Sequence, residues 1–116
     1  MIKNMPKKKK KRGYEESTKE PPIPGEGEIL CGVIRLVGGD HLIAKCLDGE
    51  DRMIRIPGRM RRRVWMREGD IILVVPWDFN PKKGDVIYRY ARSEVQKLIE
   101  KGVLPQEFLE ALSEFI

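Results

Sequence analysis

The alternation of apolar and polar positions along the chain predicts a series of short strands that begins near residue 28. Turn residues such as Gly, Asp, Asn and Pro separate five apolar runs, which cover residues 29–37, 41–47, 51–56, 71–76 and 85–90. In the third run Ile54 and Ile56 share one face while Met53 and Arg55 share the other, which is typical of a half-buried strand. Asp48-Gly49 is a strong hairpin signal directly before this run. We therefore expect five short strands.

Several positions refine this strand pattern. Gly32 marks a bend or bulge in the first strand. Residues 77–79 could extend the fourth strand, whereas the Asn, Pro and Gly residues in 80–84 predict a loop. Trp77 follows an apolar strand that has no basic residues, and we interpret this indole as structural.

The connection between the third and fourth strands differs from the others. Residues 59–67 are long enough for a couple of helical turns. Five strands with a helical connection only at this point have the order of the OB fold, a Greek-key barrel that binds oligonucleotides on one face. The predicted fold class is therefore mainly β, with an OB-fold barrel in residues 28–91. A five-stranded barrel of the SH3 type, which usually lacks this helical segment, is the alternative.

Two helices are expected after the barrel, in residues 92–116. The motif Ser93-Glu94-Val95-Gln96 has the pattern of a capping box, and Gly102 can end the helix that it opens. Pro105 can open a second helix. One side of that helix carries the apolar residues Phe108, Leu109, Leu112, Phe115 and Ile116. We expect this side to pack against the barrel, with a partner-binding face as the alternative.

Positive charge is concentrated in two parts of the chain. The net charge is +5, but residues 1–12 carry seven Lys or Arg residues, residues 52–67 carry seven Arg residues, and neither stretch contains an acid. Subtracting these fourteen charges leaves −9 on the remaining residues. Two basic zones on an otherwise acidic protein indicate a polyanionic partner that is bound at defined places.

The first of these zones belongs to an N-terminal tail. Residues 1–27 combine a lysine run with acidic and Pro-rich segments, which cannot bury enough apolar area to offset their ordering entropy, so we expect disorder. Met5-Pro6 before the lysine run leaves open whether the chain starts at Met1 or Met5. Electrostatic contacts with a polyanion are expected from Lys7, Lys8, Lys9, Lys10, Lys11 and Arg12.

The second zone places guanidinium groups beside an indole, a combination that suits phosphate contact plus stacking on a flat base. Its main candidates for RNA contact are Arg61, Arg62, Arg63 and Trp65. Val64 and Met66 can supply hydrophobic anchors, which would leave the indole exposed. Second-line candidates, from this zone and the neighbouring strands, are Arg59, Arg55 and Lys45. The alternative is a solvated charge run beside a core tryptophan.

Other residue types exclude several functions. Cys31 and Cys46 each lie in an apolar run, and we interpret both as small buried hydrophobes. The single histidine and the absence of Cys-x-x-Cys predict no metal site and no cofactor. No phosphate-binding loop, nucleophile elbow or catalytic histidine set is present, so we expect no enzyme. Without a membrane-length apolar run or a signal peptide, the chain is expected to be a cytoplasmic monomer with no membrane partner.

Several motifs recur in the order and at the separations of one family. They are Met5-Pro6-Lys7-Lys8, residues 38–41, Cys46-Leu47-Asp48-Gly49, residues 58–65, residues 70–74 and residues 85–87. In these motifs the chain resembles translation initiation factor 1A of archaea and eukaryotes. The resemblance implies an OB-fold protein that binds the A-site region of the small ribosomal subunit through its rRNA. It also implies work with the initiator tRNA complex and other initiation factors, assisting placement of initiator tRNA and mRNA.

The resemblance also assigns individual residues. The family's basic pair before Val-Trp falls on Arg62 and Arg63, and its stacking indole falls on Trp65. The family's first loop usually reads Gly-Asn-Gly-Arg, whereas this chain has Gly38-Gly39-Asp40-His41. His41 therefore stands where the family has a contacting arginine.

The eukaryotic members carry a long acidic C-terminal extension that has no counterpart here, so an archaeal-type member is the closer match. That extension engages the GTPase of subunit joining, and residues 108–116 are a hypothetical substitute for the contact. A general single-stranded RNA-binding protein or RNA chaperone on the same fold is the alternative function.

Overall fold

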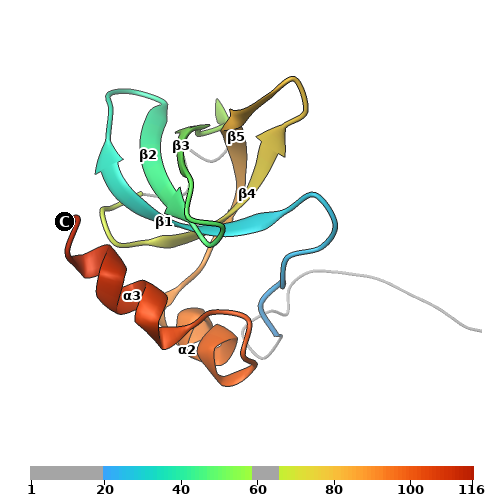
Figure 1. The fold of residues 1–116 in the computed structure, drawn as a ribbon, viewed down its shortest axis with the longest axis vertical. Helices are drawn as coiled ribbons and strands as arrows, with labels where there is room; N and C mark the ends of the chain where they lie inside the picture. The colour runs from blue at the N-terminus through green and yellow to red at the C-terminus, as the bar shows by residue number, and fades with distance from the viewer. Residues whose placement is uncertain (1–19, 59–65) are drawn as a thin grey trace, which may run out of the picture.

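The structure, a computed structural model, describes residues 20–58 and 66–116 of the chain. These residues form β1 (Ile29–Leu36), β2 (His41–Cys46), β3 (Asp51–Arg55), β4 (Ile71–Trp77), β5 (Asn80–Arg89), α2 (Arg92–Glu100) and α3 (Gln106–Ser113). The strands close into a barrel in the order β1-β2-β3-β5-β4, with β3 and β5 parallel (Figure 1). This arrangement confirms the predicted OB fold. The helical connection expected between the third and fourth strands falls largely on residues 59–65, outside the described residues.

The interior of the barrel is filled by one face of each strand. Burial alternates along β2 and β3, as the sequence pattern predicts. The buried cluster consists of Cys31, Val33, Leu42, Ala44, Cys46, Ile54, Ile56, Met66, Ile72, Val74 and Val86. Met66 is 8% exposed, so this predicted hydrophobic anchor of the arginine-rich stretch (residues 59–67) is buried. The other predicted anchor, Val64, lies outside the described residues.

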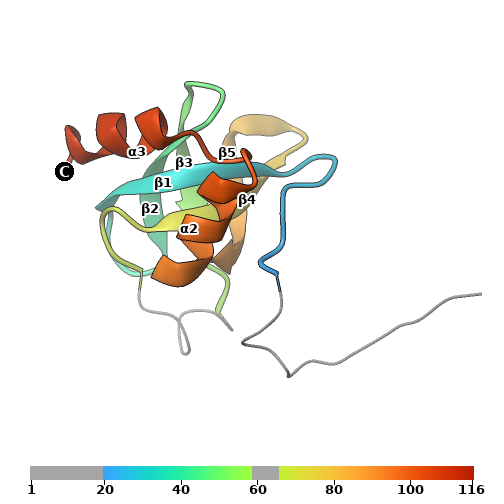
Figure 2. The same cartoon turned by 90° about the horizontal axis from the view of Figure 1, so that it is seen from below.

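The two C-terminal helices lie together on one side of the barrel, next to β1 (Figures 1 and 2). They enclose a second buried cluster with the outer sides of β1 and β4, which consists of Leu30, Ile71, Leu73, Tyr90, Leu98, Leu104 and Leu112. Leu112 of α3 is 2% exposed, whereas Phe115 and Ile116 at the chain end are about half exposed. The apolar side of α3 therefore packs on the barrel. The two exposed apolar residues, Phe115 and Ile116, follow the end of the helix.

Gly32 serves this helix packing and does not form the bulge that was predicted there. A Cβ atom at Gly32 would lie 2.4 Å from Cδ2 of Leu112, so a larger residue here would force the Leu112 side chain of α3 to shift. The irregularity in the β1–β2 register lies between Val33 and Arg35 instead. Gly32 is thus an unusual position in the strand, as the sequence indicates, and the reason is its close contact with Leu112 of α3.

The prediction of a loop at residues 80–84 is wrong, because β5 already begins at Asn80. Trp77 pairs with Asn80 and Pro76 with Gly84, which leaves only Asp78 and Phe79 in the turn. A Cβ atom at Gly84 would lie 2.8 Å from the carbonyl oxygen of Val75, so this glycine permits close strand packing. Pairing with both β3 and β4 therefore outweighs the local turn propensity of the segment. The expected extension of the fourth strand over residues 77–79 is confirmed only for Trp77.

The start of α2 also differs from the predicted capping box. The helix begins at Arg92, so Ser93 lies inside its first turn. The carboxylate of Glu94 accepts a hydrogen bond from the backbone N–H of Ala91 at 2.8 Å and from the hydroxyl of Tyr88 at 2.6 Å. Glu94 performs the capping function that the sequence pattern assigned to Gln96, two residues later.

The described part of the N-terminal segment is in contact with the body. Pro21 is buried, Glu20 lies 3.1 Å from Nζ of Lys101, and the hydroxyl of Tyr90 donates to the carbonyl oxygen of Pro22. Within the described residues, contacts with the body are already present at Glu20, so part of the segment expected to be disordered up to residue 27 packs on the body. Residues 1–19 lie outside the described part. In the described ranges, no helix has the length and apolar character needed to cross a membrane.

Candidate nucleic-acid interface

The outward side chains of the β1–β2–β3–β5 sheet form two rows across the barrel. Register pairing places Arg35 opposite Ile43, Ile43 opposite Met53, and Met53 opposite Lys83. Arg35 and Lys83 are exposed and have no ion pair within the described residues, while the two apolar side chains between them are partly exposed. In this row the side chains of Ile43 and Met53 can support a base. The cations at the two ends, Arg35 and Lys83, can contact phosphates.

The second row contains two of the predicted RNA-binding residues. His41 pairs with Arg55 across β2 and β3, and Arg55 pairs with Asp85 of β5. The guanidinium of Arg55 donates to both carboxylate oxygens of Asp85, at 3.1 and 3.3 Å, yet the arginine side chain is 52% exposed. Nδ1 of His41 lies 2.8 Å from the carboxylate of Asp40. The structure therefore brings His41 and Arg55 together. We call Arg35, His41, Ile43, Met53, Arg55 and Lys83 the outer face.

Lys45 lies on the same outward side of β2 as His41 and Ile43, next to the C-terminal end of the chain. Its Nζ lies 3.0 Å from the carboxylate of Asp51 and 4.9 Å from the ring centroid of Phe115, and the side chain is only 22% exposed. Lys45 is thus occupied by an ion pair and by a cation–π contact with the chain end. Its side chain is therefore less exposed than that of Arg55.

The remaining predicted residues lie outside the described part of the chain. They are Arg59, Arg61, Arg62, Arg63 and Trp65, together with Lys7, Lys8, Lys9, Lys10, Lys11 and Arg12 of the tail. Both ends of the arginine-rich stretch are nevertheless defined by described residues. The N–H of Ile56 donates to the carbonyl oxygen of Asp40 at 2.7 Å, which joins the entry of the stretch to the loop before His41. The N–H of Gly69 donates to Val33 at 2.8 Å, which joins its exit to β1.

The carboxylate of Asp70 further stabilises the exit of this stretch. It accepts hydrogen bonds from the backbone N–H of Arg67 at 2.9 Å and from Nε of Arg89 at 3.1 Å. The arginine-rich stretch therefore leaves the barrel beside the outer face and returns to it through ordered contacts. Its entry point at Ile56 adjoins His41 and Arg55 of the outer face.

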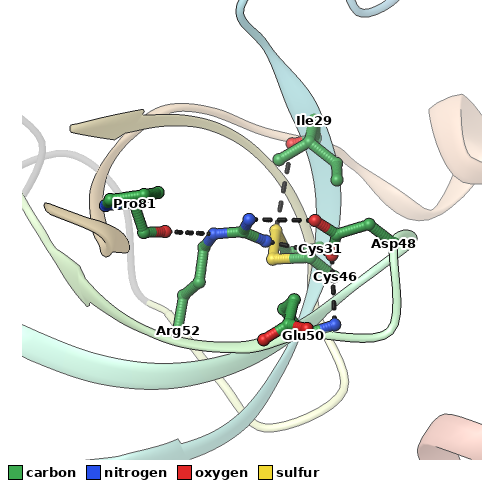
Figure 3. Close-up of polar contacts among 7 residues, drawn as sticks. All are labelled: Ile29, Cys31, Cys46, Asp48, Glu50, Arg52 and Pro81. Carbon is green, nitrogen blue, oxygen red and sulfur yellow. Dashed lines mark hydrogen bonds and ion pairs between the residues drawn. A yellow bond between two sulfur atoms is a disulfide. The ribbon is translucent and has the colours of Figure 1, made fainter. Parts of the chain in front are cut away.

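Arg52 has a different role from the other arginines of the basic zone. It is 8% exposed, its Nε donates to the carbonyl oxygen of Pro81 at 2.7 Å, and its two terminal nitrogens donate to both oxygens of Asp48 (Figure 3). The hydrogen bond from Arg52 is the main cause that lowers the pKa of Asp48 below its usual value. One of the seven charges counted in residues 52–67 is therefore neutralised inside the protein and unavailable to a polyanion.

Cys31 and Cys46 form a disulfide beside this ion pair, which corrects the prediction that they are unpaired (Figure 3). The predicted burial is confirmed, since they are 0% and 1% exposed. The two residues face each other directly in the β1–β2 register. A sequence signal for this pairing existed, because each cysteine lies seven positions from the Gly38-Gly39 turn. We call Cys31, Cys46, Asp48, Arg52 and Pro81 the interior cluster.

The sequence reasoning also missed residues that the fold places on the outer face. Lys83 was assigned to a loop and Arg35 was not singled out, because neither stands in a basic run. Lys82, next to Lys83 in β5, is also exposed. Strict alternation from Cys31 and Val33 would place Arg35 on the buried side, and the register shift between Val33 and Arg35 sets it opposite the partly exposed Ile43 instead. The position of Lys83 depends on the parallel pairing of β3 with β5. Trp77, which was interpreted as structural, is partly exposed and stacks on Phe79.

Comparison with known proteins identifies the family. Residues 16–113 match the family described as Translation initiation factor 1A / IF-1. Translation initiation factor 1A of Desulfurococcus amylolyticus is 61% identical over 111 residues, which cover 95% of this chain and 96% of that protein. The factor of Metallosphaera sedula is 46% identical over 104 residues, which cover 90% and 96% of the two chains.

A similar solved structure is a bacterial translation initiation factor, from the Wolbachia endosymbiont of Brugia malayi. It is 24% identical and has a TM-score of 0.45, with 61% of this chain and 85% of that chain covered. The sequence relatives are archaeal initiation factors, a non-enzymatic class, which confirms the resemblance found in the sequence. The chain belongs to the translation initiation factor 1A family and acts in translation initiation.

Proposed function

We propose that the outer face and the adjoining arginine-rich stretch bind rRNA at the A-site region of the small ribosomal subunit. The observation that supports this proposal is that Ile56, which leads into the arginine-rich stretch, is hydrogen-bonded beside the cationic outer face. Arg35, His41, Arg55 and Lys83 share one sheet surface, and the arginine-rich stretch enters from the end of that surface. A pre-formed barrel gives the RNA a rigid surface, so recognition depends on RNA shape more than on sequence.

Each group has a distinct role in this proposal. Arg62 and Arg63, with Arg61 and Arg59 beside them, contact phosphates. Trp65 stacks on an unpaired base. The basic tail raises the association rate through long-range attraction without shaping the barrel. Bound in this way, the protein occupies the decoding region and assists placement of initiator tRNA and mRNA together with other initiation factors.

Simultaneous replacement of Arg62 and Arg63 by alanine tests the proposal. Affinity for purified small subunits should fall, and the slope of log affinity against log salt concentration should become shallower by about 1.4 to 1.8 for two lost phosphate contacts. A matched control replaces Lys97 of α2 and Lys101, which directly follows α2. Both lysines contact Glu20, and the change in net charge is the same. Unchanged binding by a folded Arg62/Arg63 double variant would exclude the arginine-rich stretch as the site.

Chemical footprinting separates this function from that of a general single-stranded RNA-binding protein or RNA chaperone. An initiation factor that binds the A-site region protects one place on the small subunit. A chaperone protects many unrelated single strands with similar affinity. Equal affinity for unstructured RNA and for intact small subunits would favour the chaperone.

A contact between the C-terminal segment and a subunit-joining GTPase would use a small area. Leu112 is buried against β1, and Phe115 and Ile116 are the exposed apolar residues at this end of the chain. We therefore assign any such contact to these two residues, with α3 acting as the support that presents them.

A further inference from the structure

A hollow of about 530 Å³ opens to solvent between the β4–β5 hairpin and the segment that leads into β1. Apolar side chains form much of its surface, including Ile29, Pro76 and Trp77. Its rim carries the carboxylates of Glu26, Glu28, Asp48 and Asp78. The described outer-face residues are absent from its lining, so the hollow is a separate surface from the proposed RNA interface.

An aromatic pair extends one wall of this hollow outward. The rings of Trp77 and Phe79 are stacked, with centroids 5.4 Å apart and planes inclined by 24°. Phe79 is 84% exposed, the largest exposure among the large hydrophobic residues in the described part of the chain. An aromatic ring held open to water at a two-residue turn is typical of a surface that contacts a partner. The pair adds aromatic surface beside the apolar floor, with Trp77 in the lining and Phe79 as the exposed ring.

The charges around the hollow determine what kind of partner can enter. Arg52 is the cation among the lining residues, and it is already bound to Asp48, so the lining carries a net charge of −3. Within the described residues Glu26 and Asp78 have no ion pair, and the side chain of Glu28 accepts one hydrogen bond from the backbone of Gly25. Phosphate groups of RNA would be repelled here, whereas a cation would be attracted.

We propose that this hollow docks an arginine-bearing segment of a basic protein. A guanidinium group can stack on the exposed ring of Phe79, which Trp77 supports by its own stacking contact, while it donates two hydrogen bonds to one carboxylate. A lysine ammonium makes the ion pair but stacks less well on an aromatic ring. The hollow is larger than one guanidinium, and its apolar floor suits the aliphatic stem and flanking backbone of a peptide. The partner is therefore a polypeptide and not a free cation.

The position of the hollow fits a partner that is itself bound to RNA. The first residues of β5 run from Pro81 at the hollow to Lys83 on the outer face. A basic protein segment lying on the same RNA could reach the hollow while the outer face holds the RNA. The docking chemistry does not depend on the proposed rRNA contact, because the two surfaces have opposite charge.

The test uses the full-length chain and a fluorescently labelled twelve-residue peptide in which arginine alternates with glycine and serine. Two companion peptides carry lysine or neutral citrulline in place of arginine. We expect the arginine peptide to bind more tightly than the lysine peptide, and the citrulline peptide to show no binding. Phe79→Ala should weaken arginine-peptide binding roughly fivefold, and Glu26→Gln with Asp78→Asn roughly tenfold, by loss of stacking and of ion pairs.

A matched control is Glu107→Gln with Glu110→Gln, which removes two exposed carboxylates from α3. This variant should retain arginine-peptide binding, because it changes the net charge equally but lies away from the hollow. Equal loss of binding in the control and in the Glu26/Asp78 variant would overturn the proposal in favour of a net-charge effect. Phe79 and Asp78 are exposed turn residues, so their variants should remain folded.

Two further outcomes would also overturn the proposal. Peptide binding that appears only after deletion of residues 1–12 would assign the hollow to the chain's own basic tail. A loss of small-subunit RNA affinity in Phe79→Ala, with unchanged peptide affinity, would make the aromatic pair a base-stacking platform. Loss of RNA binding by the Arg62/Arg63 double variant, with peptide binding retained, would leave both proposals intact and show that the two surfaces act separately.

Discussion

Arg52 and Arg55 lie in the same short strand, three residues apart, yet they belong to regions with opposite roles. Arg52 points into the interior cluster, where a carboxylate and a backbone carbonyl satisfy its guanidinium. Arg55 points to the outer face, where its ion pair with Asp85 leaves the side chain 52% exposed. A basic residue in such a run is therefore available to a ligand only if it lies on the strand face that remains open. Four predictions test this division, in order of decreasing expected effect.

The largest effect is expected from the disulfide of the interior cluster. Reduction should lower the free energy of unfolding by about 3 kcal/mol, since the bond closes a loop of about 15 residues in the unfolded chain. Urea unfolding with and without reductant measures this loss. RNA affinity of the folded, reduced protein should remain unchanged. A large loss of affinity on reduction would mean that the interior cluster also shapes the outer face.

The two arginines of β3 provide a matched pair of variants. Arg52→Ala should cost about 2 to 3 kcal/mol, less than a fully buried ion pair because the Asp48 side chain is 40% exposed. Arg55→Ala should cost under about 1 kcal/mol, as is usual for an exposed pair. Conversely, Arg55→Ala should reduce small-subunit affinity more than Arg52→Ala does per folded molecule. Equal stability and equal affinity of the two variants would contradict the proposed difference between the interior cluster and the outer face.

The third prediction concerns Trp65 in the arginine-rich stretch. If its indole belongs to the binding surface, Trp65→Ala should lower RNA affinity by about 1 to 3 kcal/mol with little change in stability. Trp65→Phe, which keeps an aromatic ring, is the matched control and should retain part of the affinity. A stability loss of about 3 to 5 kcal/mol with unchanged binding per folded molecule would instead assign Trp65 to the core.

The smallest effect concerns the pH dependence of the interior cluster. Because Arg52 lowers the pKa of Asp48 in the folded state, the carboxylate contributes stability above its unfolded pKa near 4, and this contribution is lost as pH falls through the lower folded value. Partial exposure limits it to under about 1 kcal/mol. The stability of the wild type should therefore fall more between pH 5 and pH 2 than that of Asp48→Asn. Parallel acid profiles for the two proteins would contradict this linkage.

Much of this organisation could be predicted before the fold was known. Period-two alternation in residues 41–56 assigns each side chain of β2 and β3 to one face, and the structure follows it. The same alternation places Arg52 with Ile54 and Ile56, although the high arginine content of the stretch directed attention to charge alone. The barrel order and the family were also accessible from the sequence, because the turn signals and motif spacings are local.

The errors occurred where a distant segment overrides a local signal. Asn80, Pro81 and Gly84 are turn residues by propensity, but pairing with two neighbouring strands makes them part of β5. Gly32 indicated an unusual backbone position, while its actual reason is the side chain of Leu112, eighty positions later. Such contacts cannot be predicted from nearest neighbours in the chain.

The sequence alone predicted the faces of β2 and β3, the OB fold and the family, because these depend on the alternation, spacing and order of nearby residues. Which cations remain available for a ligand depends on the folded structure. Arg52 is bound by the carbonyl of Pro81 and Arg55 by Asp85, 29 and 30 positions away, and Cys31 meets Cys46 through the strand register. Whether a charge is satisfied inside the protein depends on partners that folding brings together, and their separation along the chain does not reveal them.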